Sequence, residues 1–163
     1  MPADHHTDHR REHHHAVSVR WTGNTGEGTA SFRGYRRANE ISAAGRPAIA
    51  GDSDPAFLGE GTGYSPEELL VAALSQCHML AYLHMCADSG VVVLSYTDDA
   101  TGTMVQTGAS GRFTEVVLHP VVTVADRSMV DKALAMHDSL HDACFVGASV
   151  NFPVRCEPSV SVA

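Results

Sequence analysis

The feature that most constrains the fold is a long apolar segment at residues 65–87. Ser65 is suited to the N-cap of a helix, Pro66 to its first turn, and Glu68 completes a capping box. Residues 69–83 hold no Asp, Glu, Lys or Arg. Because a helix that is apolar on nearly every side is normally buried, we predict a helix over 65–87 that crosses the centre of a domain or of a dimer.

The segments on either side alternate apolar and polar residues, which is typical of half-buried strands. The strands that this pattern predicts before the helix lie at 17–21, 29–35, 39–42 and 48–50. Those predicted after it lie at 91–96, 103–107, 112–124 and 148–162, and Pro153 and Pro158 interrupt the last of them. Pro120 should interrupt its strand, and a second helix is predicted over 127–143 with Asp126 or Ser128 as its cap. Strands and helices do not alternate one for one, so an α+β fold is favoured over a doubly wound sheet.

The length of 163 residues predicts a single domain, which we place at 16–163. Residues 1–15 hold six of the eleven histidines, without periodic apolar positions, and are expected to form a mobile tail. A net charge of -8 with 11 Lys and Arg argues against nucleic acid as a partner. We expect no membrane span and no signal peptide, and therefore a cytoplasmic protein.

Four cysteines define the functional question: Cys77, Cys86, Cys144 and Cys156. In a reducing compartment they are expected to be free thiols, which leaves buried structural thiols, a metal site and redox chemistry as alternatives. Cys77 lies in the middle of the first predicted helix and Cys144 at the end of the second. A peroxide converts one thiolate to a sulfenic acid, and a second thiol can condense with it to a disulfide. Two cysteines on two packed helices suit that cycle.

A reactive Cys77 needs a nearby cation, because an apolar surround alone disfavours the thiolate. The chain has a single lysine, so the candidates are Arg36 and Arg37 at the end of a predicted strand. A buried arginine needs a carboxylate, which Glu67 or Glu68 at the helix start could supply. The alternative is that all four are ordinary surface charges.

Histidines on the second predicted helix raise the alternative of a metal site. His137, His141 and Cys144 are spaced i, i+4 and i+7, which places them on one helical face, and two imidazoles and a thiolate can bind zinc. A fourth ligand would have to come from elsewhere, with His78 and His84 as candidates. The chain has neither a His-Glu-x-x-His nor a Cys-x-x-Cys motif, and we expect neither a metal nor another cofactor.

The run SPEELLVAALSQCHML at residues 65–80 resembles the central helix of the OsmC/Ohr family, the osmotically inducible and organic hydroperoxide resistance proteins. The run WTGN at 21–24, with the glycines that follow it, is similar to the first strand and turn of the OsmC-like branch. Residues 141–154 are similar to its second-cysteine segment. The resemblance covers nearly all of the chain after residue 15.

The resemblance implies an intertwined homodimer of α+β subunits, with antiparallel sheets wrapped around two central helices and the active sites at the dimer interface. It also implies Cys77 as the peroxidatic thiol and Cys144 as the resolving thiol. Glu67 would anchor the activating arginine, which is Arg37 by its Tyr-x-Arg pattern, with Arg36 as the alternative. Cys86 and Cys156 have no role in that scheme and are expected to be structural.

The function expected from this resemblance is a thiol-dependent peroxidase in oxidative stress defence. It would reduce organic hydroperoxides to alcohols and be recycled by an external dithiol. The alternative is a non-catalytic stress-related protein that binds an apolar ligand or a metal at the dimer interface.

Overall fold

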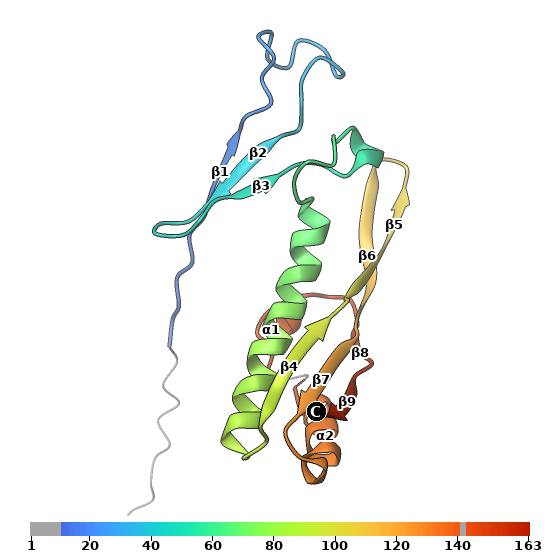
Figure 1. The fold of residues 1–163 in the computed structure, drawn as a ribbon. Helices are drawn as coiled ribbons and strands as arrows, with labels where there is room; N and C mark the ends of the chain where they lie inside the picture. Colours follow the sequence, from blue (N-terminus) through green and yellow to red (C-terminus); the bar gives the residue numbers. More distant parts are fainter. Residues whose placement is uncertain (1–10, 141–142) are drawn as a thin grey trace, which may run out of the picture. The chain divides into compact units, whose positions relative to one another are not determined.

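The computed structural model describes residues 11–140 and 143–163. The chain forms two compact units, Met1–Ser65 and Pro66–Ala163 (Figure 1). The first unit contains one antiparallel sheet in the order β1-β2-β3. Its strands are β1 (Ser18–Trp21), β2 (Asn39–Ser42) and β3 (Ile49–Gly51). None of the described residues of this unit is a buried large apolar side chain.

The strand predicted at 29–35 is wrong, because residues 22–38 form turns and loops. The side-chain oxygen of Asn24 accepts hydrogen bonds from the backbone N–H groups of Gly26, at 2.9 Å, and Gly28, at 3.0 Å. Both glycines have positive φ, at 121° and 58°, a conformation that closes turns and ends strands. Local turn chemistry therefore outweighs the alternating pattern here.

The loop predicted after β3 is present and is held by a buried carboxylate. Asp52 accepts hydrogen bonds from the backbone N–H groups of Ser53 and Glu60, both at 2.8 Å. A single 3-10 turn, η1 (Pro55–Phe57), lies within it. Asp52 thus satisfies the backbone of a segment that has no sheet partner.

The first predicted helix is confirmed as α1 (Pro66–Asp88), which begins directly after Ser65. Only one stripe of α1 is buried within the chain: Leu74, His78, Tyr82 and Cys86. Leu80, on another side of the helix, is 57% exposed. A single chain therefore does not bury α1 on every side, although the sequence analysis expected such burial. By length and composition alone α1 would also pass as a membrane span, contrary to the sequence expectation. Its buried histidine and tyrosine and its acidic ends favour a core helix.

The second unit has two three-stranded sheets. One has the order β4-β7-β9, formed by β4 (Val93–Asp98), β7 (Pro120–Val124) and β9 (Ser159–Val162). The other has the order β5-β6-β8, formed by β5 (Thr101–Thr107), β6 (Ser110–Leu118) and β8 (Val154–Cys156). β4 with β7 and β5 with β6 are antiparallel, but β6 with β8 and β7 with β9 are parallel.

The parallel pairs correct the prediction of purely antiparallel sheets. Parallel neighbours need a long crossover, and the chain between β7 and β8 supplies one that contains the second helix. The break predicted at Pro120 is confirmed, since β6 ends at Leu118 and β7 begins at Pro120. At this break Asp98 accepts hydrogen bonds from the backbone N–H of His119, at 2.7 Å, and from the Ser75 hydroxyl on α1, at 2.6 Å.

The second helix is shorter than predicted. Asp126 caps the 3-10 turn η2 (Arg127–Met129), as one of the two predicted caps, and α2 (Val130–Asp138) follows. The predicted end at residue 143 is wrong, because the N–H of Ser139 turns back to the Met136 carbonyl, at 3.2 Å, and closes the last turn. A further 3-10 turn, η3 (Gly147–Ser149), precedes β8.

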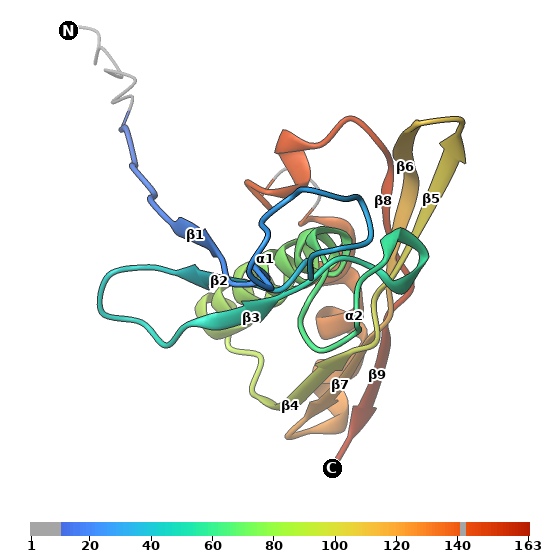
Figure 2. The ribbon, with the colours of Figure 1, turned by 90° about the horizontal axis from the view of Figure 1, so that it is seen from above.

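Both helices pack on the same side of these sheets (Figure 2). One core cluster joins α1, α2, β7 and β9 around Tyr82, whose hydroxyl donates a hydrogen bond to the Ala133 carbonyl at 3.1 Å. The other joins α1 and β6 around Leu74. β5 lies so close to α1 that a Cβ at Gly102 would come within 2.7 Å of Val71. These contacts fix α1 against the strands.

We expect Leu74→Ala to lower the free energy of unfolding by about 2–5 kcal/mol, because it leaves a cavity at a side chain that is 1% exposed. Leu134→Ala, at a helix residue that is 43% exposed, is the matched control and should cost less than about 1 kcal/mol. Urea unfolding followed by circular dichroism measures both. Equal losses for the two variants would contradict this placement of the core.

Candidate functional site

The structure brings Cys77 and Cys144 together from 67 residues apart in the sequence. The Cys77 thiol is close enough to Cys144 to act on its pKa, and both thiols are free. Cys77 is half-buried on α1, whereas Cys144 is 7% exposed. The backbone N–H of Gly147 in η3 donates a hydrogen bond to the Cys144 sulfur at 3.2 Å. The pair thus joins the middle of α1 to the segment between α2 and η3.

The surroundings of Cys144 disfavour its thiolate. Burial, and then the contact with Cys77, raise the pKa of Cys144 to about 11, although the Gly147 N–H opposes this. Cys144 is therefore a protonated thiol at neutral pH and a poor nucleophile. This state suits a thiol that reacts second rather than first.

The other predicted catalytic residues lie in different surroundings. The Arg37 guanidinium donates hydrogen bonds to the carbonyls of Tyr35 and Phe32, both at 2.6 Å, and lies over both rings. Arg36 forms an ion pair with Glu60 at 3.2 Å, a partner that the sequence analysis did not identify. Glu67 is in the first turn of α1, ten residues and so about 15 Å along the helix from Cys77.

The sequence analysis placed His137, His141 and Cys144 on one helical face as a possible metal site, and the structure does not form this face. α2 ends at Asp138, so Cys144 is not on a helical face with His137, and His141 lies outside the described residues. Of the two suggested fourth ligands, His84 is exposed and pairs with Asp88 at 3.3 Å. The other, His78, contacts His137 directly.

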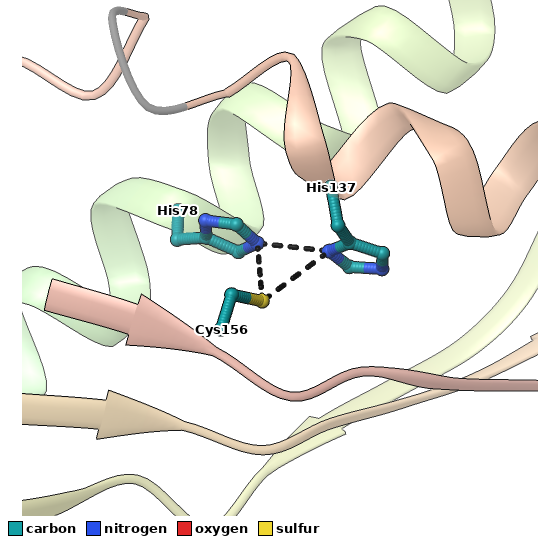
Figure 3. A group of neighbouring side chains, drawn as sticks. All are labelled: His78, His137 and Cys156. Carbon is teal, nitrogen blue, oxygen red and sulfur yellow. Dashed lines mark hydrogen bonds between the residues drawn. The ribbon is translucent and has the colours of Figure 1, made fainter.

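A different cluster forms around these two histidines. His78 on α1, His137 on α2 and Cys156 at the end of β8 point toward one another (Figure 3). His78 Nε2 and His137 Nδ1 are 2.9 Å apart, and the Cys156 sulfur is 3.6 Å from the first and 3.8 Å from the second. Tyr82 stacks on the His137 ring with centroids 4.0 Å apart. The expectation that Cys156 is merely structural overlooked this arrangement.

Both imidazoles of the cluster are buried and uncharged at neutral pH. Burial lowers the pKa of His78, with Asp98 opposing, and burial together with His78 lowers the pKa of His137 to about 4. Burial, and then Asp98, Asp138 and Glu157, raise the pKa of Cys156 to about 12. The cluster therefore presents two neutral imidazoles and a thiol.

A cavity of about 630 Å³ adjoins both groups. Cys144 lines it together with all three members of the cluster, and its apolar wall includes Leu74, Leu118, Val150 and Phe152. A cavity of this size and composition is typical of small-molecule sites.

The fold and this arrangement can be compared with known proteins. The family model described as OsmC-like protein matches residues 59–159, more than half of the chain. This chain belongs to the OsmC-like protein family. The resemblance seen in the sequence is thereby confirmed. A search of curated proteins finds no match to this OsmC-like protein.

Solved structures share the fold. An OsmC-like protein of unknown function from Vibrio cholerae is 30% identical, with a TM-score of 0.80 over 90% of this chain and 99% of that one. The organic hydroperoxide resistance protein OhrB of Bacillus subtilis is 19% identical, with a TM-score of 0.54 over 90% and 98%. An organic hydroperoxide resistance protein OsmC from Legionella pneumophila is 16% identical, with a TM-score of 0.59 over 92% and 99%.

The raised pKa of Cys144 predicts how its alkylation depends on pH. In the reduced wild-type protein under anaerobic conditions, where no disulfide between the pair forms, the rate of iodoacetamide labelling of Cys144 should rise about tenfold per pH unit from pH 7 to 10, because the thiolate fraction does. Peptide mapping by mass spectrometry measures the rate. The urea-unfolded chain is the control and should level off near the ordinary thiol pKa. A plateau below pH 9 in the folded protein would contradict this description of Cys144.

Proposed function

We propose that this OsmC-like protein is a thiol peroxidase that reduces organic hydroperoxides to alcohols. The observation that carries the proposal is the contact between the Cys77 and Cys144 thiols. A sulfenic acid formed at one of them has a resolving thiol already in place, which protects it from over-oxidation.

In the proposed cycle the Cys77 thiolate attacks the distal oxygen of the hydroperoxide and the O–O bond breaks. The alkoxide leaves and takes up a proton to become the alcohol, while Cys77 becomes a sulfenic acid. The Cys144 thiol then attacks the Cys77 sulfur, so that the disulfide forms and the sulfenic oxygen leaves as water. An external dithiol reduces the disulfide through two exchange steps and is itself oxidised.

The order of the two thiols follows from their surroundings. Cys144 is nearly inaccessible and its pKa is raised to about 11, so it is a poor first nucleophile. Cys77 is half-buried and lies in the middle of helix α1. This supports Cys77 as the attacking thiol and Cys144 as the resolving thiol.

The apolar wall beside Cys144 supports a carbon-containing peroxide over hydrogen peroxide as the substrate. Two structural neighbours are named organic hydroperoxide resistance proteins, which agrees with this choice. We assign activation of Cys77 to Arg37 and anchoring of the arginine to Glu67, as the family resemblance implies.

Substitution of each thiol separates their roles. Cys77→Ser should abolish consumption of cumene hydroperoxide, whereas Cys144→Ser should allow one turnover and then over-oxidation of Cys77 to the sulfinic acid. Cys86→Ala, at a buried cysteine outside the pair, is the control and should keep turnover within about twofold. Peroxide assays and intact mass spectrometry measure these outcomes. Full activity of Cys77→Ser would disprove the mechanism.

We further propose that the protein is a homodimer. Leu80 on the apolar helix α1 is exposed within one chain. The described residues of the first unit likewise leave apolar side chains such as Val19, Phe32 and Ile49 exposed. Because the described residues of this unit bury no large apolar side chain, they cannot offset the entropy of ordering their own chain. A second copy that covers these surfaces would supply the missing burial.

A charge placed on α1 tests the dimer. Leu80→Glu should shift the protein from dimer to monomer in analytical ultracentrifugation, because a carboxylate in an apolar interface is strongly unfavourable. Leu134→Glu, at a partly exposed leucine on α2, is the control and should leave the dimer intact. A monomeric wild-type protein at micromolar concentration would refute the proposal.

A further inference from the structure

Three ligand-type atoms converge inside the second unit, and each belongs to a side chain that commonly binds zinc. His78 Nε2, His137 Nδ1 and Cys156 Sγ lie within 4.8 Å of one another. If the N–H of one imidazole donates to the other nitrogen, it uses the only ring lone pair in the group. In that arrangement the thiol proton has no nitrogen acceptor among the three, whereas an N–H that donates to the sulfur leaves the other nitrogen to accept the thiol proton. A cation, in contrast, accepts all three lone pairs at once.

The separations of these atoms match a tetrahedral zinc site. Zn–S and Zn–N bonds of about 2.3 and 2.05 Å place sulfur about 3.6 Å from each nitrogen and the nitrogens about 3.3 Å apart at tetrahedral angles. The structure has sulfur to nitrogen distances of 3.6 and 3.8 Å and a nitrogen to nitrogen distance of 2.9 Å. An increase of about 0.4 Å in the distance between the two nitrogens brings that distance to its tetrahedral value.

The charges around the cluster also favour a cation. Asp98 and Asp138 both act on Cys156 through their negative charge. Among the described ion pairs neither carboxylate has a basic partner. Arg155 lines the same cavity but is bound to Glu115 and Glu157. The site thus combines donor atoms with two nearby carboxylates that have no ion pair among the described residues, and such a setting favours a divalent ion.

We propose that His78, His137 and Cys156 bind a divalent zinc-type ion whose fourth position opens to the cavity. Ligation breaks the S–H bond of Cys156, releases the proton to solvent and forms the metal–thiolate bond without any change of oxidation state. All three ligands line the cavity, and no oxygen of Asp138, which also lines it, joins the three converging atoms. Among the described residues no fourth ligand joins these three atoms, so we assign the fourth position to water or to a small ligand that enters from the cavity. Three protein ligands with one open position are typical of catalytic rather than structural zinc.

The proposal does not rest on the peroxidase mechanism. It uses neither Cys77 nor Cys144, and it differs from the sequence-predicted set of His137, His141 and Cys144 by replacing two of its three members. The sequence analysis named metal binding at a dimer interface as an alternative function. The site proposed here would also bind a metal, but within one chain.

The test is a cobalt titration of the reduced, full-length protein under anaerobic conditions. Histidines of the N-terminal segment could bind cobalt as well, so the background variant replaces all six with alanine: His5, His6, His9, His13, His14 and His15. One equivalent of Co²⁺ should produce the intense visible absorption of tetrahedral cobalt and a thiolate-to-cobalt charge-transfer band. One equivalent of Zn²⁺ should abolish both.

Single substitutions in this background identify the ligands. Cys156→Ser should remove the charge-transfer band, and His78→Gln should weaken Co²⁺ binding by more than about tenfold. Cys144→Ser, at the other cysteine of the cavity, and His84→Gln, at an exposed histidine on the same helix, are matched controls that should bind as the background does.

Absence of a stoichiometric tetrahedral spectrum in the folded background protein would overturn the proposal. A charge-transfer band that survives Cys156→Ser but is lost in Cys144→Ser would also overturn it and would support the set predicted from the sequence. Circular dichroism confirms that each variant is folded, and Cys156→Ala serves as the second variant if Cys156→Ser unfolds. Peroxide consumption is not part of the readout, so failure here leaves the thiol peroxidase unaffected.

Discussion

Burial of one stripe of α1 is the constraint on which the second unit depends. Its members recur every four residues, at Leu74, His78, Tyr82 and Cys86, and two of them are polar. Each polar member has a partner on α2, since Tyr82 bonds to the Ala133 carbonyl and His78 contacts His137. A rotation of α1 about its axis would separate both pairs and leave buried polar groups unsatisfied. Polar contacts therefore fix the rotation of α1 about its axis, which apolar packing alone would specify less strictly.

Much of the fold follows from local signals in the sequence. The start of α1 is set by Ser65 and Pro66, and the break between β6 and β7 by Pro120. The errors arise where distant contacts decide. β8 lies parallel to β6 only because a helical crossover separates them, and no pattern within either strand encodes that direction. The strand predicted at 29–35 failed for the opposite reason, because turns at nearby glycines override its alternation.

The candidate site divides in the same way. The pairing of Cys77 with Cys144 was predicted through the family resemblance, and the contact between the two thiols agrees with it. Cys156 was missed because its partners His78 and His137 are 78 and 19 residues away. No spacing rule relates a strand residue to histidines on two helices. Cys156 reaches the two histidines only because β8 pairs with β6 in the register that places Cys156 beside Leu118.

The parallel addition of β8 and β9 has a consequence for synthesis of the chain. Each sheet of the second unit receives its third strand from residues 154–162, so translation must pass Cys156 before one sheet is complete and Val162 before the other is. Both core clusters draw side chains from this segment, among them Cys156 and Val160. A nascent chain arrested at residue 150 would have both helices, but β6 and β7 would lack the strands β8 and β9 that pair with them. The second unit is therefore expected to fold in one late, cooperative step and not progressively from its N-terminus.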